Sequence, residues 1–206
     1  MRDEKIGDFL DRLADRVPAP GGGATAALHA AQAAALLGMV ARYSSAEKYA
    51  EHRDTIDRIR DSADELRGTA LGLAADDAAA FTVVSDAYRL PAESDAQRAA
   101  RSAAIASALV GAAQPPARVI TAAAKIMTLA EELLPVGNPN VSTDVAAAVE
   151  AARAAATTAR VNVEVNLTGV RDDAVRAELV AATDRVDGLA ARADRVTAAV
   201  RAGIAG

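Results

Sequence analysis

The stretch PAPGGGATAALHAAQAAALLGMVARY, residues 18–43, places two prolines and three consecutive glycines directly before a long run of alanine and leucine. Alanine is the strongest helix former. The run is apolar on almost every face, which is typical of a helix that is buried on all sides. The sequence therefore predicts a buried helix from Ala24 to about Tyr43, with the rest of the fold packed around it.

The glycines, Gly21, Gly22 and Gly23, leave two alternatives open. Three glycines cost more backbone entropy than a simple turn requires. At a helix start they present free amide groups and the positive end of the helix dipole, which favour an anion. A close-packed turn explains them equally well. No predicted strand precedes them, so they do not match a nucleotide-binding fingerprint.

The composition indicates helices that pack through small side chains. Of the 206 residues, 51% are hydrophobic but only 2% are aromatic, and much of the apolar content is alanine. Because large apolar side chains are scarce, one chain buries a modest apolar area. We therefore expect an additional interface, in a homo-oligomer built on flat alanine faces.

Charge and composition exclude several classes of protein. The net charge is −5 and no segment is strongly basic, so nucleic-acid binding is not indicated. The chain has no cysteine, which excludes disulfides and thiolate nucleophiles. The start, MRDEKIGDFL, has no apolar signal core, and charged residues interrupt the alanine runs. We expect a soluble cytoplasmic protein with no membrane span.

Apolar spacing predicts an all-α fold, an antiparallel bundle of about five to seven helices, some of them long and kinked. No domain boundary stands out within residues 1–206, so a single domain is expected. The predicted helices cover residues 3–16, 24–43, 44–90, 96–134, from about 141 onward, and 172–202.

Several signals mark the expected helix ends and breaks. Ser44 with Glu47 fits a capping box that would open the third helix. Ser94 or Asp95 would cap the fourth, and the prolines at 115 and 116 predict a kink or restart inside it. Glycines at 68 and 72 are possible breaks in the third helix.

The segment ARVNVEVNL, residues 159–167, alternates apolar and polar residues, which is a strand pattern. It follows an uninterrupted alanine-rich run, and no other segment offers a strand to pair with it. An isolated strand is not stable. We therefore expect this segment to be helical.

Two aspartates, Asp76 and Asp77, lie among alanines in the middle of a predicted helix, where aspartate is a poor helix former. A carboxyl group that faces a dry groove has a raised pKa and is able to transfer protons. The alternative is a solvated face, which we favour for Asp76.

A second polar cluster, GNPNVSTDVAAA at residues 137–148, contains Asn138, Asn140 and Asp144 at an expected helix start. Helix capping explains the Ser, Thr and Asp residues. Two asparagines and a proline exceed what capping needs. Amide side chains offer donor and acceptor together, which suits the edge of a heterocycle.

The remaining candidates are weaker. Asn162 and Asn166 are four residues apart and share a helix face, either as a ligand surface or as an interhelical hydrogen-bond pair. Lys48 is either a site residue or an ordinary surface lysine. The two histidines, His29 and His52, are far apart, and no metal-ligand spacing appears.

Taken in order, these segments resemble the cyclodeaminase/cyclohydrolase family. Its members include formiminotetrahydrofolate cyclodeaminase, the C-terminal half of formiminotransferase-cyclodeaminase and methenyltetrahydrofolate cyclohydrolase. The resemblance covers residues 5–204. It rests on the Pro-Gly-Gly-Gly helix opening, Lys48–Tyr49, Asp77 with Phe81, residues 137–148 with Thr143 in place of a serine, and the N-x-x-x-N-L of Asn162 and Asn166.

The resemblance implies an all-helical homodimer that acts on tetrahydrofolates. It suggests Asp77 as the proton carrier and Lys48 as a group that tunes its pKa or stabilises charge. The substrate-binding residues would be Gly21, Gly22, Gly23, Asn138, Asn140, Asp144, Asn162 and Asn166. Ring closure or opening at the one-carbon unit needs a positioned proton carrier but no metal or redox cofactor.

Three functions stay open at this point. The first is folate cyclodeamination and the second is methenyltetrahydrofolate cyclohydrolysis. The third is a non-catalytic helical dimer that binds a folate-like ligand or a partner protein. All three depend on the triple glycine, Asp77 and the Asn138–Asn140 segment lining a common cavity, within one subunit or across two.

Overall fold

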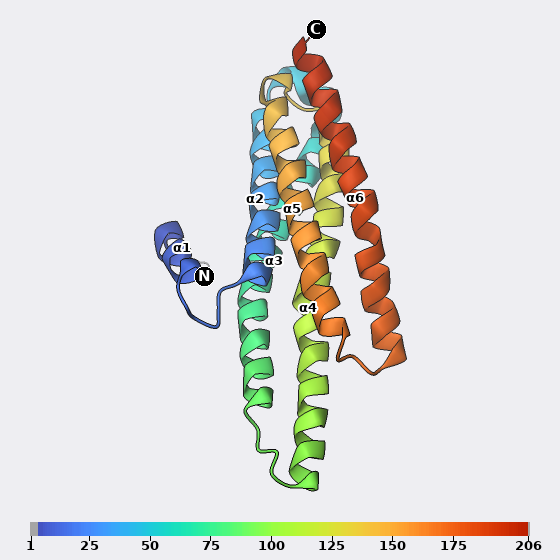
Figure 1. Ribbon diagram of the computed structural model, residues 1–206. Coiled ribbons are helices and arrows are strands. Elements are labelled where there is room, and N and C mark those ends of the chain that lie inside the picture. The colour runs from blue at the N-terminus through green and yellow to red at the C-terminus, as the bar shows by residue number, and fades with distance from the viewer. Residues whose placement is uncertain (1–3, 206) are drawn as a thin grey trace.

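The computed structural model describes residues 4–205, and these residues form six α-helices, two short 3-10 segments and no strand (Figure 1). The helices are α1 (Ile6–Ala14), α2 (Gly22–Tyr43), α3 (Arg53–Tyr88), α4 (Asp95–Leu133), α5 (Ser142–Leu167) and α6 (Asp173–Ala205). The 3-10 segments are η1 (Glu47–His52) and η2 (Pro139–Val141). The predicted all-α bundle is confirmed. The predicted first helix, residues 3–16, begins outside the described residues.

Four helices form the centre of the bundle. Helix α2 packs against α3 and α5, and α4 closes the ring by packing against both of them. Helix α6 lies along α5 and α4. In Figure 1 the α3–α4 hairpin extends beyond the start of α2, while α1 lies to the side of α2, and side chains of α1 and α2 line one cavity.

Helix α2 is the core helix that the alanine run predicts. Most of its buried positions are alanines, which allow neighbouring helices to approach closely. Its length and composition alone would suffice to cross a membrane, but 61% of its most apolar window is buried inside the bundle. That burial is typical of a core helix, so its apolar surface is used in packing against α3 and α5.

Two expected helix starts have different outcomes. Ser94, one of the two predicted caps, caps α4, and the structure adds a full capping box with Gln97. The expected capping box at Ser44 is wrong, because α3 begins only at Arg53. The buried Ser44 hydroxyl donates to the carbonyl of Val40 at 2.8 Å and accepts the backbone N–H of Asn138 at 2.8 Å. It therefore joins the end of α2 to the α4–α5 connection.

The two prolines do not break α4, which is continuous from Asp95 to Leu133. Proline lacks an N–H, so Pro116 leaves the carbonyl of Ala112 without its partner in the helix. The side-chain amide of Asn166 donates to that carbonyl at 3.3 Å. A side chain from α5 thus replaces the hydrogen bond that the proline removes. Helix α3 likewise passes through both glycines without a break.

The alternating segment is the last part of α5, as expected. Val163 is fully buried, whereas Val161 and Val165 are 60% and 63% exposed. The alternation therefore reflects one valine on the core face of a helix and two on its outer face.

Candidate functional site

A cavity of about 420 Å³ lies at the end of the bundle where α2 begins. The linker before α2, the first residues of α2, and parts of α3, α4 and α5 form its walls. The lining residues are Pro18, Ala19, Gly21, Gly22, Gly23, Asp77, Phe81, Val84, Tyr88, Leu109, Ala112, Asn162, Val165, Asn166 and Thr168. The structure therefore brings together the triple glycine, Asp77 and the two C-terminal asparagines.

Asp77 packs directly on the start of α2. A β-carbon at position 23 would overlap the Asp77 carboxylate, so only glycine fits there without displacing it. The other two glycines are less constrained. A β-carbon at Gly21 would meet nothing within 4 Å, and one at Gly22 would make an ordinary contact with the Asn162 amide at 3.6 Å.

Partial burial raises the pKa of the Asp77 carboxyl group above its ordinary value, because removal from water penalises the charged form. A hydrogen bond from the backbone N–H of Ala24 acts in the opposite direction and offsets part of this rise. Asp77 is thus a carboxyl group with a raised pKa that lines a cavity, which suits a proton carrier.

The α3 wall of the cavity is a regular helical stripe. Asp77, Phe81, Val84 and Tyr88 are spaced by four, three and four residues, which places them on one face. Phe81 and Tyr88 remain 47% and 51% exposed. Their rings are therefore available to a flat ligand in a chain that has few aromatic residues.

The α5 wall carries Asn162 and Asn166, whose side-chain amides are already hydrogen-bonded. The Asn162 amide donates to the carbonyl of Thr158 at 2.9 Å. The Asn166 amide donates to the carbonyls of Asn162 and Ala112 at 2.8 and 3.3 Å. Their donors are engaged within α5 and toward α4, while their side-chain oxygens accept no hydrogen bond among residues 4–205.

The other predicted site residues do not line this cavity. Lys48 lies in η1, and Asn138, Asn140 and Asp144 lie around η2 and the start of α5. Segment η1 follows α2 directly, and Asn138 before η2 is hydrogen-bonded to Ser44 and Tyr43 at the end of α2. Both segments therefore lie at the far end of α2, about 30 Å from its glycine start at the usual helical rise. Within one subunit, these four residues therefore do not share a cavity with Asp77, and a cavity completed by a second subunit stays a prediction.

The far-end segment has a clear local structure. The Asn138 side chain accepts the N–H of Asn140 at 3.1 Å and donates to the carbonyl of Tyr43 at 3.1 Å. Lys48 is exposed, with its ammonium group 4.9 Å from the ring centre of Tyr49. Asn138 thus fixes the α4–α5 connection to the end of α2, while Asn140 and Lys48 face solvent.

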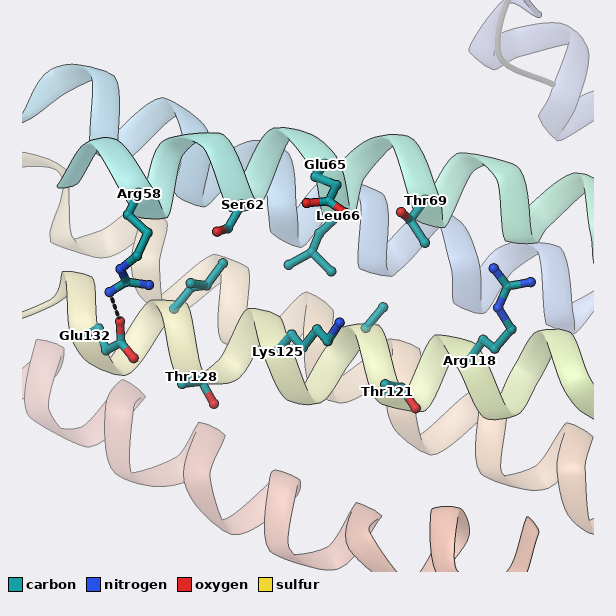
Figure 2. Close-up of a pocket in the computed structure, with 12 residues that line it drawn as sticks. Arg58, Ser62, Glu65, Leu66, Thr69, Arg118, Thr121, Lys125, Thr128 and Glu132 are labelled. Carbon is teal, nitrogen blue, oxygen red and sulfur yellow. Dashed lines mark hydrogen bonds and ion pairs between the residues drawn. The ribbon is translucent and has the colours of Figure 1, made fainter. Parts of the chain in front are cut away.

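A larger groove of about 500 Å³ runs along the outer side of α3 and α4 (Figure 2). It holds none of the predicted site residues. Arg58 at its one end is paired with Glu132, and Arg118 at the other approaches Asp76 at 3.6 Å. The Asp76 side chain is exposed, as expected, and lies near Arg118. It does not line the cavity that holds Asp77. We place the candidate site at the cavity that holds Asp77, because that cavity brings together the triple glycine, Asp77, Asn162 and Asn166.

Within residues 4–205, no group of three or more acidic or histidine side chains is placed to hold a metal ion.

Sequence reasoning missed most of the cavity walls, namely Pro18, Ala19, Val84, Tyr88, Leu109, Ala112, Val165 and Thr168. The α3 members were accessible through the helical spacing from Asp77. The α4 members carry no such signal, because an apolar side chain does not show which neighbour it faces.

Comparisons with known proteins agree with this architecture. Residues 5–185 match the family described as formiminotransferase-cyclodeaminase. A methenyltetrahydrofolate cyclohydrolase from Methylorubrum extorquens is 39% identical over 176 residues, 85% of each chain. A formimidoyltransferase-cyclodeaminase from Sus scrofa is 30% identical over 83% of this chain and 32% of its own. The crystal structure of a formiminotetrahydrofolate cyclodeaminase from Thermotoga maritima superposes with a TM-score of 0.87 at 27% identity, over 98% of both chains.

Proposed function

Because this chain belongs to the formiminotransferase-cyclodeaminase family, we propose that it is a methenyltetrahydrofolate cyclohydrolase in which Asp77 carries the proton. The single observation that carries the proton-carrier role is the partly buried Asp77 carboxyl group, with its raised pKa, on the wall of the cavity at the start of α2. The cyclohydrolase reaction is supported by the methenyltetrahydrofolate cyclohydrolase from Methylorubrum extorquens, which is 39% identical over 85% of each chain.

The reaction has two proton transfers that one carboxylate is able to serve. Water adds to the positively charged methenyl carbon, and ionised Asp77 takes the proton that the water loses. The carbon–nitrogen bond then breaks as the hydroxyl becomes a formyl group, and the departing ring nitrogen receives a proton. One proton is released overall. A carboxyl group with a pKa raised toward the working pH suits both transfers.

The remaining cavity residues would position the substrate. Phe81 and Tyr88 provide aromatic faces for a flat ring. The glycines allow the ligand to approach the backbone at the start of α2. The oxygens of Asn162 and Asn166 would accept hydrogen bonds from the ring edge.

The test compares two neighbouring aspartates. Methenyltetrahydrofolate absorbs in the near ultraviolet, so hydrolysis is followed as loss of this signal above the buffer rate. Asp77→Asn should lower kcat by about a hundredfold or more. Asp76→Asn, on the exposed side of α3, should retain wild-type turnover. Wild-type kcat in Asp77→Asn would remove the proton-carrier assignment.

A second candidate is cyclodeamination, which the structural match to the Thermotoga maritima enzyme favours. In that reaction a folate nitrogen attacks the formimino carbon and ammonia leaves, with Asp77 moving the proton between the two nitrogens. Formimino-tetrahydrofolate would then produce the near-ultraviolet signal. Growth of the signal with no accelerated decay of methenyltetrahydrofolate would replace the cyclohydrolase assignment with this one.

Lys48, Asn138, Asn140 and Asp144 lie far from Asp77 within one subunit. This separation supports a homodimer in which two subunits complete each site. A two-fold axis across the bundle would bring the Asn138–Asp144 end of one subunit to the Asp77 end of the other. Apolar side chains that α1 leaves exposed, Ile6 at 80% and Leu10 at 53%, are consistent with an uncovered interface. Lys48 would then act near the partner's Asp77.

Complementation tests this arrangement. Asp77→Asn and Asn140→Ala subunits are each expected to be inactive as homodimers. After unfolding and refolding together, mixed dimers should regain about a quarter of wild-type activity, because half of the dimers carry one intact site. Light scattering that shows a monomer, or a mixture that stays inactive although mixed dimers form, would exclude a shared site.

A further inference from the structure

Helix α4 carries two adjacent prolines in its interior, Pro115 and Pro116, one turn after a residue that lines the cavity with Asp77. In a regular α-helix the N–H of each residue bonds the carbonyl four residues earlier. Proline has no N–H and is destabilising at such a position. The prolines therefore leave two carbonyls without their helical partners, that of Gly111 for Pro115 and that of Ala112 for Pro116.

The two carbonyls differ in their surroundings. Gly111 is exposed, so water is able to bond its carbonyl. Ala112 is buried, and a buried carbonyl without a partner is costly. Helix α5 packs along α4 here (Figure 1), and its Asn166 side chain donates to the Ala112 carbonyl at 3.3 Å. Pro116 thus frees the acceptor that holds the Asn166 amide against α4.

The hydrogen bonds of Asn166 fix which end of its amide faces the protein. The nitrogen donates to the carbonyl of Asn162 at 2.8 Å and to that of Ala112, so both of its hydrogens are used. Carbonyls only accept, so the nitrogen and not the oxygen must face them. The oxygen accepts no hydrogen bond among residues 4–205 and is not one of their buried unpaired atoms. Since Asn166 lines the cavity, the group that it offers to a ligand is an acceptor.

Replacement of Pro116 would loosen this arrangement. With an N–H at position 116, the helix itself would bond the carbonyl of Ala112. The Asn166 amide would then keep one bond, to Asn162, instead of two. Held by one bond, the amide is freer to rotate and to present either its oxygen or its nitrogen to the cavity.

We propose that Pro116 is a positioning residue of the candidate site, which holds Asn166 with its oxygen offered to the substrate. This inference rests on the proposed folate activity. A fixed acceptor favours a ring edge that carries N–H or NH2 donors, as the aminopyrimidinone ring of a folate does, and disfavours a carbonyl edge. A site built around a hydrogen bond discriminates strongly against a ligand that lacks the partner group. Pro116 does not line the cavity, so it acts through Asn166.

The first experiment compares the two prolines. Pro116→Ala should raise KM for methenyltetrahydrofolate about tenfold and leave kcat within about twofold of the wild type, because the weakened contact is the same in the ground and transition states. Pro115→Ala is the matched control, since the carbonyl that it would reclaim is bonded by no side chain among residues 4–205, and its KM should not change. Both variants should fold, because alanine suits a helix interior better than proline. Equal KM values for the two variants would overturn the proposal.

A backbone ester at position 116 separates the missing N–H from the proline ring. Lactic acid incorporated at this position has the side chain of alanine but brings no backbone N–H. This protein should keep the KM of the wild type, whereas Pro116→Ala should not. An ester protein with the raised KM of Pro116→Ala would show that the ring is needed and not the missing N–H, which would also overturn the proposal.

A thermal-unfolding cycle tests the link without any substrate. Asn166→Ala should lower the Tm of the wild type, because it leaves the buried carbonyl of Ala112 without a partner. In the Pro116→Ala background the same change should lower the Tm by less, since the helix then supplies that partner. Equal losses in both backgrounds would show that the two positions are not linked. If the Tm changes are coupled but the wild type hydrolyses no folate, the proposed function fails and the link between Pro116 and Asn166 stands.

Discussion

The carboxylate of Asp77 occupies the space that a side chain at position 23 would fill. This relationship explains why one of the three glycines is required. It also identifies the anion at the start of α2 as a side chain of the protein itself, with the N–H of Ala24 as its hydrogen-bond donor. The glycine segment therefore positions the acid that we propose as the proton carrier.

Gly23→Ala should lower kcat while the protein still folds. The added methyl group must push the Asp77 carboxylate away from the Ala24 N–H, at a cost of about 1–3 kcal/mol in the free energy of unfolding. We expect a folded protein whose kcat falls roughly tenfold or more. Urea unfolding and the absorbance assay measure the two quantities.

Gly21→Ala is the matched control, because a β-carbon there meets nothing within 4 Å. It should unfold with the free energy of the wild type, and its kcat should exceed that of Gly23→Ala because it leaves the Asp77 carboxylate in place. In combination with Asp77→Asn, Gly23→Ala should cause little further loss of activity, since both changes act on one carboxylate. Fully additive losses would show that Gly23 acts through something other than Asp77.

Asp77→Asn should stabilise the protein at neutral pH. Because burial raises the pKa of Asp77 in the folded state, its protonated form favours folding, and this contribution is lost as the pH rises through the raised pKa. The Tm of the variant should exceed that of the wild type at about pH 8, and the difference should narrow toward about pH 4. A lower Tm at both pH values would mean that the hydrogen bond from Ala24 outweighs desolvation.

The pH dependence of kcat/KM should also report the titration of the Asp77 carboxyl group. Ionised Asp77 is the base, so kcat/KM should fall as the pH drops through its pKa. Since that pKa is raised, the acidic limb should lie above the range of an ordinary aspartate, about pH 4. A wild-type profile that stays flat down to that range would argue against the base.

Ser44→Ala should destabilise the far end of the bundle. The Ser44 hydroxyl is the acceptor for the Asn138 N–H, so its removal leaves that group unpaired and should cost about 1–3 kcal/mol in unfolding free energy. The neighbouring Ser45 is exposed, and Ser45→Ala should change stability by less than about 0.5 kcal/mol. Equal effects of the two substitutions would contradict the proposed tie between α2 and the α4–α5 connection.

Arg192→Gln should weaken the attachment of α6 to α4. The Arg192 guanidinium donates to both carboxylate oxygens of Glu131, at 2.9 and 2.7 Å, and this pairing lowers the pKa of Glu131. The pair stabilises the fold above the ordinary pKa of glutamate, and its contribution is lost as the pH falls through the lowered value.

We expect Arg192→Gln to lower the free energy of unfolding by about 1 kcal/mol near neutral pH. The difference from the wild type should become smaller below about pH 4. Arg185→Gln, on the same helix, should have little effect because Arg185 forms no ion pair among residues 4–205. A loss that stays constant across this pH range would point to packing of the Arg192 stem and not to charge.

Local chemistry made much of the fold predictable. Alanine content and apolar spacing place the helices, and Ser94 was one of two residues predicted to cap the start of α4. The valine alternation at residues 161–165 was correctly predicted as helical, because the sequence offers no other strand to pair with it. Ser44 was misread because its hydroxyl pairs with Asn138, which is 94 residues away and invisible to a local capping rule.

The candidate site was only partly predictable, for a similar reason. Asp77 and Phe81 are one helical turn apart, and Asn162 and Asn166 likewise share a face, so each pair follows from spacing. Nothing in the order of motifs along the chain shows at which end of a helix each one lies. The 22-residue length of α2 separates Asn140 from Asp77, and only the structure shows this.

The bond between Asn166 and the carbonyl of Ala112 links two distant positions through the proline at 116. If Pro116 were replaced by a residue with an N–H, the helix would reclaim that carbonyl and the Asn166 amide would lose its acceptor. Relatives that carry a proline at position 116 should therefore also carry a side chain with a hydrogen-bond donor at position 166.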